Sequence, residues 1–425
     1  MKIKKSERTK KEKRTIISVI VLITLAIAVI AAGIYLNTNK PAAVNGTVII
    51  QRDGEAINPE IAAPINDYFN KTFEATANLQ TVDMSELFYD PAGENAVLNQ
   101  SALDYLIQLR LKQSNDLKMI NYQCQLNVLA INEVDEAVEV ELLENYTVNF
   151  ALIPEVNSVT SGIRHHFWLI KKGDIYQIAE HLQDEDSFNL MQDAIGAQPS
   201  QATAVIEALL GKSTTAVADL AAAKQAFNAG EQPFKQAFTG HPYQPDAAVN
   251  YAKAWVDPEK TLRNTAQFGI YDDVGGNCNN YISQCLNAGG IPMDIFGDEF
   301  TQWKWYSDEL NLDETETGRS PAWAGVNEFY LYARENSGYG LSAVVDDNVY
   351  SGAVGDILQF GYDNQWLHSV IITQVVKDKD GNIIDYLINS NTTDRISYPA
   401  SAYGYPQQRL IKILGWNDQE LPPSE

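Results

Sequence analysis

The chain has 425 residues, a formal net charge of −24 and only three cysteines, and 45% of its residues are hydrophobic. A surface this acidic offers no electrostatic footprint for a phosphate backbone, so we expect no nucleic-acid partner. Three cysteines in a chain of this length form no disulfide framework, and their odd number leaves at least one thiol free.

The first 36 residues predict a membrane anchor. Residues 1–14 form a basic tail, and residues 15–36 carry no charge. At about 1.5 Å per residue this apolar segment is about 33 Å long, enough to cross a bilayer core of about 30 Å. We therefore expect a single-pass protein of the cell membrane, with its N-terminus in the cytoplasm and the rest of the chain outside. The small residues Ala31, Ala32 and Gly33 leave cleavage open as an alternative.

After a spacer over residues 37–59, the pattern predicts a first domain over residues 60–190. Apolar residues recur every three or four positions over 60–76 and 95–115, which is typical of amphipathic helices. Two-residue alternation then predicts strands within 119–182. Helices followed by an antiparallel meander make an α+β domain. This order of elements resembles the cystatin-like or nuclear-transport-factor-2-like roll, and such a likeness implies no function.

A second domain is predicted over residues 241–416, beginning with a helix over 241–257. The Ala- and Gln-rich residues 191–240 predict short helices that link the two domains. The acidic tail, residues 417–425, is expected to be disordered.

Two of the three cysteines lie in GGNCNNYISQCLNAGG, residues 275–290. Glycine pairs at both ends of this stretch predict a short helix that Asn277 or Asn279 caps, with Cys278 in its first turn. Free N–H groups and the helix dipole stabilise an anion there, so we expect a lowered thiol pKa. Cys285 lies two turns further along the same stripe and is expected to pack. Taken alone, Cys278 would more often be a small buried residue too.

A reactive thiolate needs a base and a group that orients the base. His165 and His166 lie in a strand-like run, so they point to opposite faces and form no ligand pair. His368 lies near the start of the second strand of a predicted hairpin, GDILQFGYDNQWLHSVIITQVV. The next predicted strand, DYLINSNTTDR, brings Asn389 and Asn391 alongside on one face.

Five ordered blocks over about residues 243–416 resemble the putative amidase domain family, which is related to the CHAP-type and NlpC-type peptidoglycan hydrolases. The blocks are AAVNYAKAW, GGNCNNYISQCLNAGG, SPAWAGVNEFYLY, GDILQF with WLHSVIIT, and INSNTTDR. The resemblance implies that Cys278 is the nucleophile and His368 the base. The chain departs from the family at Asn277, where Asp is common, and at Asn391, where His often stands.

We therefore predict a papain-like catalytic site of Cys278, His368 and Asn391, with Asn389 as the alternative orienting residue. The thiol attacks an amide carbonyl while His368 takes its proton or holds it in a thiolate–imidazolium pair. The backbone N–H of Cys278 and a second donor, which the sequence does not identify, stabilise the oxyanion.

Trp366, Trp323 and Asn280 are predicted to bind substrate, although core packing is the commoner place for tryptophan. The sequence contains no HExxH, no paired CxxC, no P-loop and no dinucleotide fingerprint, so we expect no metal or organic cofactor. The expected fold class is α+β: one N-terminal transmembrane helix, the roll, and a papain-like domain whose helix carries Cys and whose antiparallel sheet carries His.

The predicted function is that of a membrane-anchored extracellular cysteine amidase or endopeptidase. The resemblance and the expected location together make cell-wall peptidoglycan the expected substrate. Two alternatives stay open. The second domain could be inactive and the protein a surface scaffold, or an amine could replace water and make the enzyme a transpeptidase.

Overall fold

The computed structural model describes residues 44–418 apart from 135–136, 198–200, 235–236, 273, 296–303 and 308–318. Within this part of the chain, no helix is long and apolar enough to cross a membrane. This finding corrects the expected fold class and location. The described chain combines helices with one large sheet. The prediction of a membrane anchor is withdrawn. The stretch 15–36 that suggested it lies outside the described residues.

The first half of the described chain places two long helices against an antiparallel meander, as the periodicities predict. The first long helix begins after Asn58, whose side chain accepts a hydrogen bond from the Glu60 N–H. The elements are β1 (Asn45–Gln51), α2 (Pro59–Asn78), η1 (Ser85–Leu87), α3 (Glu94–Lys112), β2 (Met119–Val134), β3 (Ala137–Phe150), β4 (Ser158–Lys172), β5 (Ile175–Gln183), α4 (Asp186–Ala197) and α5 (Ala202–Asn228).

Strand β1 was not predicted, because it lies in the stretch interpreted as a spacer. It pairs in parallel with β2, from Asn45 opposite Asn121 to Gln51 opposite Asn127. A seven-residue edge strand whose partner lies about 75 positions later leaves little local signal in the sequence. The sheet therefore begins at Asn45 rather than after residue 60.

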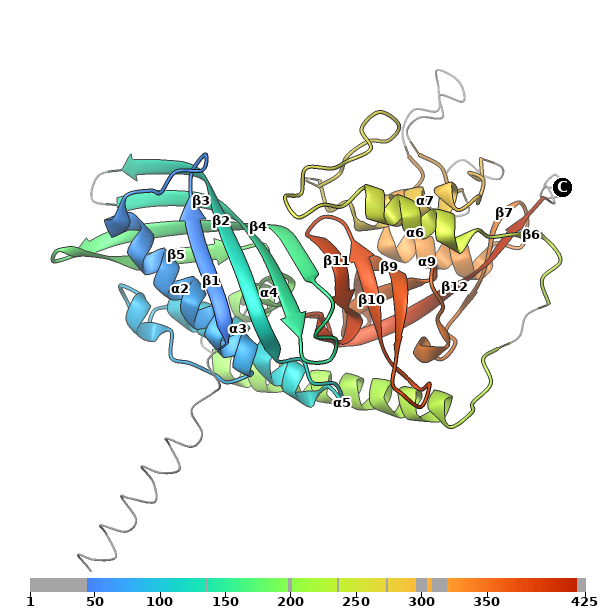
Figure 1. Ribbon diagram of the computed structural model, residues 1–425, viewed down its shortest axis with the longest axis horizontal. Helices are drawn as coiled ribbons and strands as arrows, with labels where there is room; N and C mark the ends of the chain where they lie inside the picture. Colours follow the sequence, from blue (N-terminus) through green and yellow to red (C-terminus); the bar gives the residue numbers. More distant parts are fainter. Residues whose placement is uncertain are drawn as a thin grey trace, which may run out of the picture. The chain divides into compact units, whose positions relative to one another are not determined.

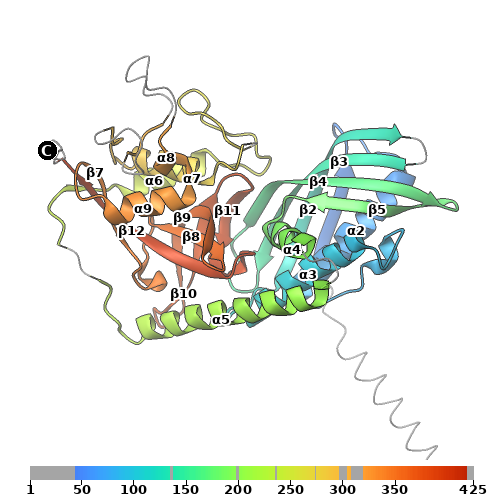
Figure 2. The same cartoon turned by 180° about the vertical axis from the view of Figure 1, so that it is seen from behind.

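The Ala-rich segment forms one long helix rather than the short helices predicted for it. Alanine has the highest helix propensity, and no proline interrupts residues 202–228, so nothing in the segment ends the helix early. Helix α5 packs against α3 and α4 of the first half and against β10 and β12 of the second half. Figure 2 shows it running beneath both halves of the structure.

The second half carries the predicted cysteine helix and the predicted histidine hairpin. Its elements are β6 (His241–Pro242), α6 (Pro245–Ala254), α7 (Cys278–Ala288), α8 (Pro321–Ala324), α9 (Val326–Glu335), β7 (Gly340–Val345), η3 (Val349–Ser351), β8 (Ile357–Tyr362), β9 (Gln365–Lys377), β10 (Ile383–Ser390), β11 (Asp394–Pro399), η4 (Ala400–Ala402) and β12 (Gln407–Asn417).

One sheet runs through both halves because β4 pairs with β11 in antiparallel fashion. The paired residues are Ser161 with Asp394, Thr160 with Arg395 and Val159 with Ile396. The strand order is β1-β2-β3-β4-β11-β10-β9-β8-β12-β6, with β5 beside β4 and β7 beside β12. Figure 1 shows the strands of the first half meeting β11 at this junction. The sequence suggested two separate domains and gave no sign of this pairing.

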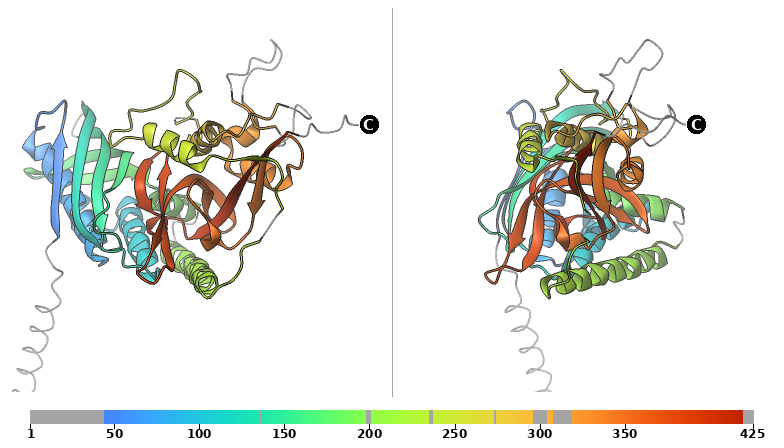
Figure 3. Two further views of the ribbon diagram at one scale, coloured as in Figure 1. Left: turned by 45° about the vertical axis from the view of Figure 1, so that its right-hand side comes forward. Right: turned by 90° about the vertical axis from the view of Figure 1, so that its right-hand side faces the viewer.

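Strand β9 is buried on both faces, which explains its nearly continuous apolar sequence. Ile371 belongs to a core cluster with α6 and α7. Val370 and Ile372 belong to the largest core cluster, which also contains residues of α2 and of strands β2 to β4. Figure 3 shows α6 and α7 on one side of these strands and α5 on the other.

Candidate active site

A two-glycine turn delivers Cys278 to the first position of α7. Gly275 and Gly276 have φ angles of 89° and 98°, which favour glycine. The turn is held by the hydroxyl of Thr392, which accepts a hydrogen bond of 2.6 Å from the Asn277 N–H. The predicted place of Cys278 in the first turn of the helix is therefore confirmed.

Cys285 lies in the interior of the same helix and is fully buried in the core cluster around α7. Burial raises its pKa well above the usual value for a thiol. Cys124 of β2 is buried as well, and neither forms a disulfide. These two cysteines therefore pack, and Cys278 is the cysteine at a helix start.

His368 lies on β9, with 7% of its surface exposed, and its cross-strand neighbour is Phe360 of β8. The imidazole ring stacks on Tyr403, with 5.4 Å between ring centres, and its Nε2 has no hydrogen-bond partner. By strand alternation it shares a face with Val370 and Ile372. The ring therefore faces the core that both halves share.

Cys278 approaches β9 where β10 has already ended. The last pair between these strands is Asn389 with Ile371, two residues short of Ser369. The N–H of Ser369 lies close to the Cys278 sulfur. The Ser369 hydroxyl donates to the Asn279 side chain at 2.9 Å, which fixes the start of α7 against the strand. The chain neighbour of His368 thus holds Cys278, although no hydrogen bond joins the thiol to the imidazole within the described residues.

Burial controls the charge state of both groups. It raises the pKa of Cys278 to about 11, although the N–H groups of Ser369 and Asn279 lower it in part. Burial also lowers the pKa of His368 to about 3, and the nearby Arg395 lowers it further. The prediction of a lowered thiol pKa is therefore wrong, because removal from water outweighs the helix N-terminus. At neutral pH the pair consists of a neutral thiol and a neutral imidazole.

Asn391 does not contact His368. It follows the end of β10, in the turn before β11. The two-residue alternation of strands, on which its prediction rested, therefore does not apply to it. Its side-chain oxygen accepts a hydrogen bond of 2.5 Å from the Asn277 side chain, and its nitrogen donates to the Trp255 carbonyl at 3.4 Å. Asn389, the alternative, accepts from the Ser397 N–H. The two departures from the family pattern, Asn277 and Asn391, thus form one contact.

Of the three residues predicted to bind substrate, Trp323 and Asn280 contact each other, and Trp366 lines a separate hollow. Trp323 is completely buried, and its indole N–H donates to the Asn280 side chain at 2.7 Å. Asn280 is 1% exposed and donates to the Gly269 carbonyl. These two side chains hold the helix and its preceding loop in place and do not face solvent. Trp366 is half-buried beneath the Arg409 guanidinium and borders a hollow beside α5, which neither Cys278 nor His368 lines.

Asp272 and Asp394 bind the same arginine. Arg263 donates to Asp272 at 2.8 Å and to Asp394 at 2.8 Å. Burial raises the pKa of Asp394 to about 7, although Arg263 lowers it in part. This ion-pair cluster fastens the loop before Cys278 to β11, so Asp272 is not available to an oxyanion.

Tyr403 was missed in the sequence analysis, because no motif marks it. It follows η4 and is 1% exposed, and its hydroxyl forms no hydrogen bond of normal geometry to the described residues. Burial raises its pKa well above the usual value for tyrosine, and the nearby Asp186 and Cys278 raise it further, although the nearby Arg395 lowers it in part. Its ring stacks on His368. The Tyr403 side chain therefore lies close to both the thiol and the imidazole.

Residues 242–414 match the family model described as "Putative amidase domain". This part of the chain is therefore similar to a family described as putative amidases. The resemblance to this family is thereby confirmed. The relationships to papain-like and CHAP-type enzymes and to a cystatin-like roll stay predictions.

Two Bacillus subtilis (strain 168) proteins are similar in sequence. The uncharacterized protein YhbB is 33% identical over 165 residues, which cover 38% of this chain and 45% of that protein. The uncharacterized protein YjcM is 25% identical over 167 residues, which cover 37% and 32% respectively. The chain thus spans less than half the length of either relative.

One solved structure, the intermembrane space region of the chloroplast protein ARC6, aligns with 30% of this chain and 97% of its own. The identity is 14% and the TM-score is 0.22. So low a TM-score supports no conclusion about fold or function.

The contact between Asn277 and Asn391 can be tested with a double-mutant cycle. Asn277→Asp puts a carboxylate against the Asn391 oxygen, so two acceptors face each other in a buried place. We expect it to lower the free energy of unfolding by about 1–3 kcal/mol. Adding Asn391→His supplies an N–H donor and should restore most of the loss.

Urea unfolding followed by tryptophan fluorescence measures the four stabilities of this cycle. We expect a coupling energy of about 1–3 kcal/mol. Purely additive effects would show that the two positions do not act as a pair.

Proposed function

We propose that this protein is a cysteine amidase in which Cys278 attacks an amide carbonyl and His368 accepts its proton. The observation that carries the proposal is that the Ser369 N–H lies near enough to the Cys278 sulfur to lower the thiol pKa. This contact brings the start of α7 to the residue next to His368 on β9. Of the three cysteines, Cys278 alone lies at a helix start, and its stretch falls within the matched amidase region.

Two mechanisms were predicted: proton transfer to His368 during attack, or a preformed thiolate–imidazolium pair. The neutral thiol and imidazole favour the first. With the thiol pKa near 11 and the imidazole pKa near 3, a resting thiolate–imidazolium pair is disfavoured at neutral pH. His368 therefore acts as a general base that takes the proton as the sulfur attacks. The sulfur forms a thioester with the acyl group, the protonated imidazole gives its proton to the leaving amine, and water then hydrolyses the thioester.

The oxyanion is stabilised by the start of α7 and by Tyr403. The N–H groups of Cys278 and Asn279 point outward from the first helical turn and already lower the thiol pKa. The Tyr403 hydroxyl supplies the second donor, because it is buried, forms no hydrogen bond of normal geometry to the described residues and lies near the sulfur. Asn391 takes a positioning role through Asn277 instead of orienting His368.

We propose peptide amides of bacterial peptidoglycan as the substrate. The support is the amidase family match together with the likeness of the sequence blocks to peptidoglycan hydrolases. Hydrolysis and transfer share the same acyl-enzyme. The reaction products therefore identify whether water or an amine is the acceptor.

The proposal is tested by incubating the full chain with purified Bacillus subtilis peptidoglycan and identifying released fragments and new amino groups by mass spectrometry. Cys278→Ala should reduce the release to background. Cys285→Ala is the matched control, since it lies on the same helix, and should keep the activity of the folded fraction. Equal loss in both variants would contradict a nucleophilic role for Cys278. No release by the wild type would contradict the proposed substrate.

Tyr403→Phe separates catalysis from folding. The Tyr403 hydroxyl forms no hydrogen bond within the described part of the chain, so its removal should leave the free energy of unfolding unchanged or raise it. Loss of one oxyanion donor should lower kcat by about 100-fold. Both quantities are measured on the same preparation, by urea unfolding and by peptidoglycan release.

Tyr386→Phe is the matched control for that variant. The Tyr386 hydroxyl is buried on β10 and donates to the Val349 carbonyl at 3.0 Å. Its removal should cost about 1 kcal/mol of stability and leave kcat unchanged. A Tyr403→Phe variant that behaves like this control would exclude Tyr403 as an oxyanion donor.

A further inference from the structure

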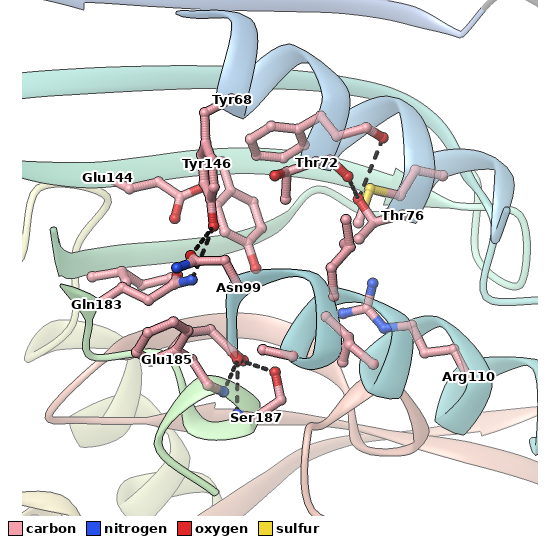
Figure 4. A pocket seen from close by; sticks show the side chains of 17 residues that line it. Tyr68, Thr72, Thr76, Asn99, Arg110, Glu144, Tyr146, Gln183, Glu185 and Ser187 are labelled. Atoms are coloured by element: carbon pink, nitrogen blue, oxygen red, sulfur yellow. Dashed lines mark hydrogen bonds between the residues drawn. The ribbon is translucent and has the colours of Figure 1, made fainter. Parts of the chain in front are cut away.

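The first half contains a cavity of its own, separate from the candidate active site. It lies between helices α2 and α3, strands β2 to β5 and the start of α4, and it encloses about 630 Å³ of space between atoms, part of it open to solvent. Figure 4 shows the side chains that line it. Phe73, Leu103 and Met119 form apolar parts of the wall. Neither Cys278 nor His368 borders it.

Arg110 brings a positive charge to this cavity. It is 3% exposed, and its guanidinium donates from Nη2 to the Tyr398 hydroxyl at 2.8 Å and to the Ala402 carbonyl at 3.2 Å. Its Nη1 has no hydrogen-bond partner among the residues that the structure describes. Figure 4 shows the guanidinium directed toward the other lining side chains. A buried arginine with a free N–H group is costly unless an acceptor comes to it.

No carboxylate of the described chain forms an ion pair with Arg110. The two glutamates that line the cavity have other partners. Glu144 accepts from His165 at 3.1 Å, and Glu185 accepts from the Ser187 N–H at 2.8 Å at the start of α4. The structure therefore holds a buried cation whose neutralising anion is not one of these lining residues. An external carboxylate would both pair with the charge and satisfy Nη1.

The cavity also contains hydrogen-bonding groups from α2, α3 and β5. The Tyr68 hydroxyl donates to Asn99 at 2.9 Å and accepts from Gln183 at 3.3 Å. Thr72, one turn along α2, has a buried hydroxyl near that of Tyr68, with no hydrogen bond of normal geometry to the described residues. The lining thus combines one cation, an apolar wall, hydroxyl groups and two glutamates that have partners of their own.

We propose that this cavity is a binding site for a small carboxylic acid with an apolar body. The carboxylate pairs with Arg110 and accepts a hydrogen bond from Nη1. The apolar body lies against Phe73, Leu103 and Met119, where its removal from water adds to the affinity. The chemical class follows from the lining, and the inference does not depend on the proposed amidase activity.

Octanoate is the probe, and octylamine, of equal chain length and opposite charge, is the ligand control. Isothermal titration calorimetry on the full chain should show one octanoate per chain and no binding of octylamine. Arg110→Gln should weaken octanoate binding at least tenfold, because it removes a charge-assisted hydrogen bond. Arg52→Gln, a change at an exposed arginine, should leave binding unchanged.

A second variant keeps the test decisive if Arg110→Gln fails to fold, since Arg110 also bonds to Ala402. Leu106→Trp places a larger side chain at a half-buried position of the cavity wall and leaves the guanidinium in place. It should abolish octanoate binding. Absence of octanoate binding to the wild type would overturn the proposal. So would equal binding of octylamine, or octanoate binding that persists in a folded Leu106→Trp variant.

Discussion

The pairing of β4 with β11 is the constraint on which the rest of the structure depends. Through it the two halves share one sheet and one core. Arg395 of β11 lies at the junction, bonds to Thr160 of β4, and pairs with Asp186 at the start of α4. Its guanidinium lies over the rings of Tyr398 and Tyr403, and Tyr403 in turn stacks on His368. The environment of the imidazole is thus set partly by the first half.

This arrangement sets the chemistry open to the candidate site. A helix N-terminus ordinarily lowers the pKa of a thiol, but Cys278 and His368 are each only 7% exposed. Burial disfavours the thiolate and the imidazolium alike. Asp186 raises the pKa of Cys278, and Arg395 lowers that of His368, so both charges of the junction act in the same direction as burial. A neutral pair that transfers its proton during attack is the consistent outcome.

Local patterns predicted much of the fold. The glycine pair before Cys278, the apolar strand after His368 and the amphipathic helices α2 and α3 each follow from spacing within one element. Long-range contacts did not leave such a pattern. Asn391 belongs to a turn, and its partner Asn277 is 114 positions away. Tyr403 has no sequence motif, and the edge strand β1 and the pairing of β4 with β11 depend on partners far along the chain.

The expected thiol pKa failed for a related reason. A sequence shows that a cysteine begins a helix, but the burial that determines its charge comes from segments folded over it. The expected membrane anchor rested on composition alone, in a stretch outside the described residues. None of the described helices is long and apolar enough to cross a membrane.

Site-resolved alkylation of the full chain with iodoacetamide tests the central claim most directly, with Cys285 and Cys124 as internal references. We predict that Cys278 reacts faster than both, that its rate is still rising at pH 9 as a thiol pKa near 11 requires, and that His368→Ala slows it at neutral pH. Equal labelling of the three cysteines, or a Cys278 rate unaffected by His368→Ala, would contradict the account.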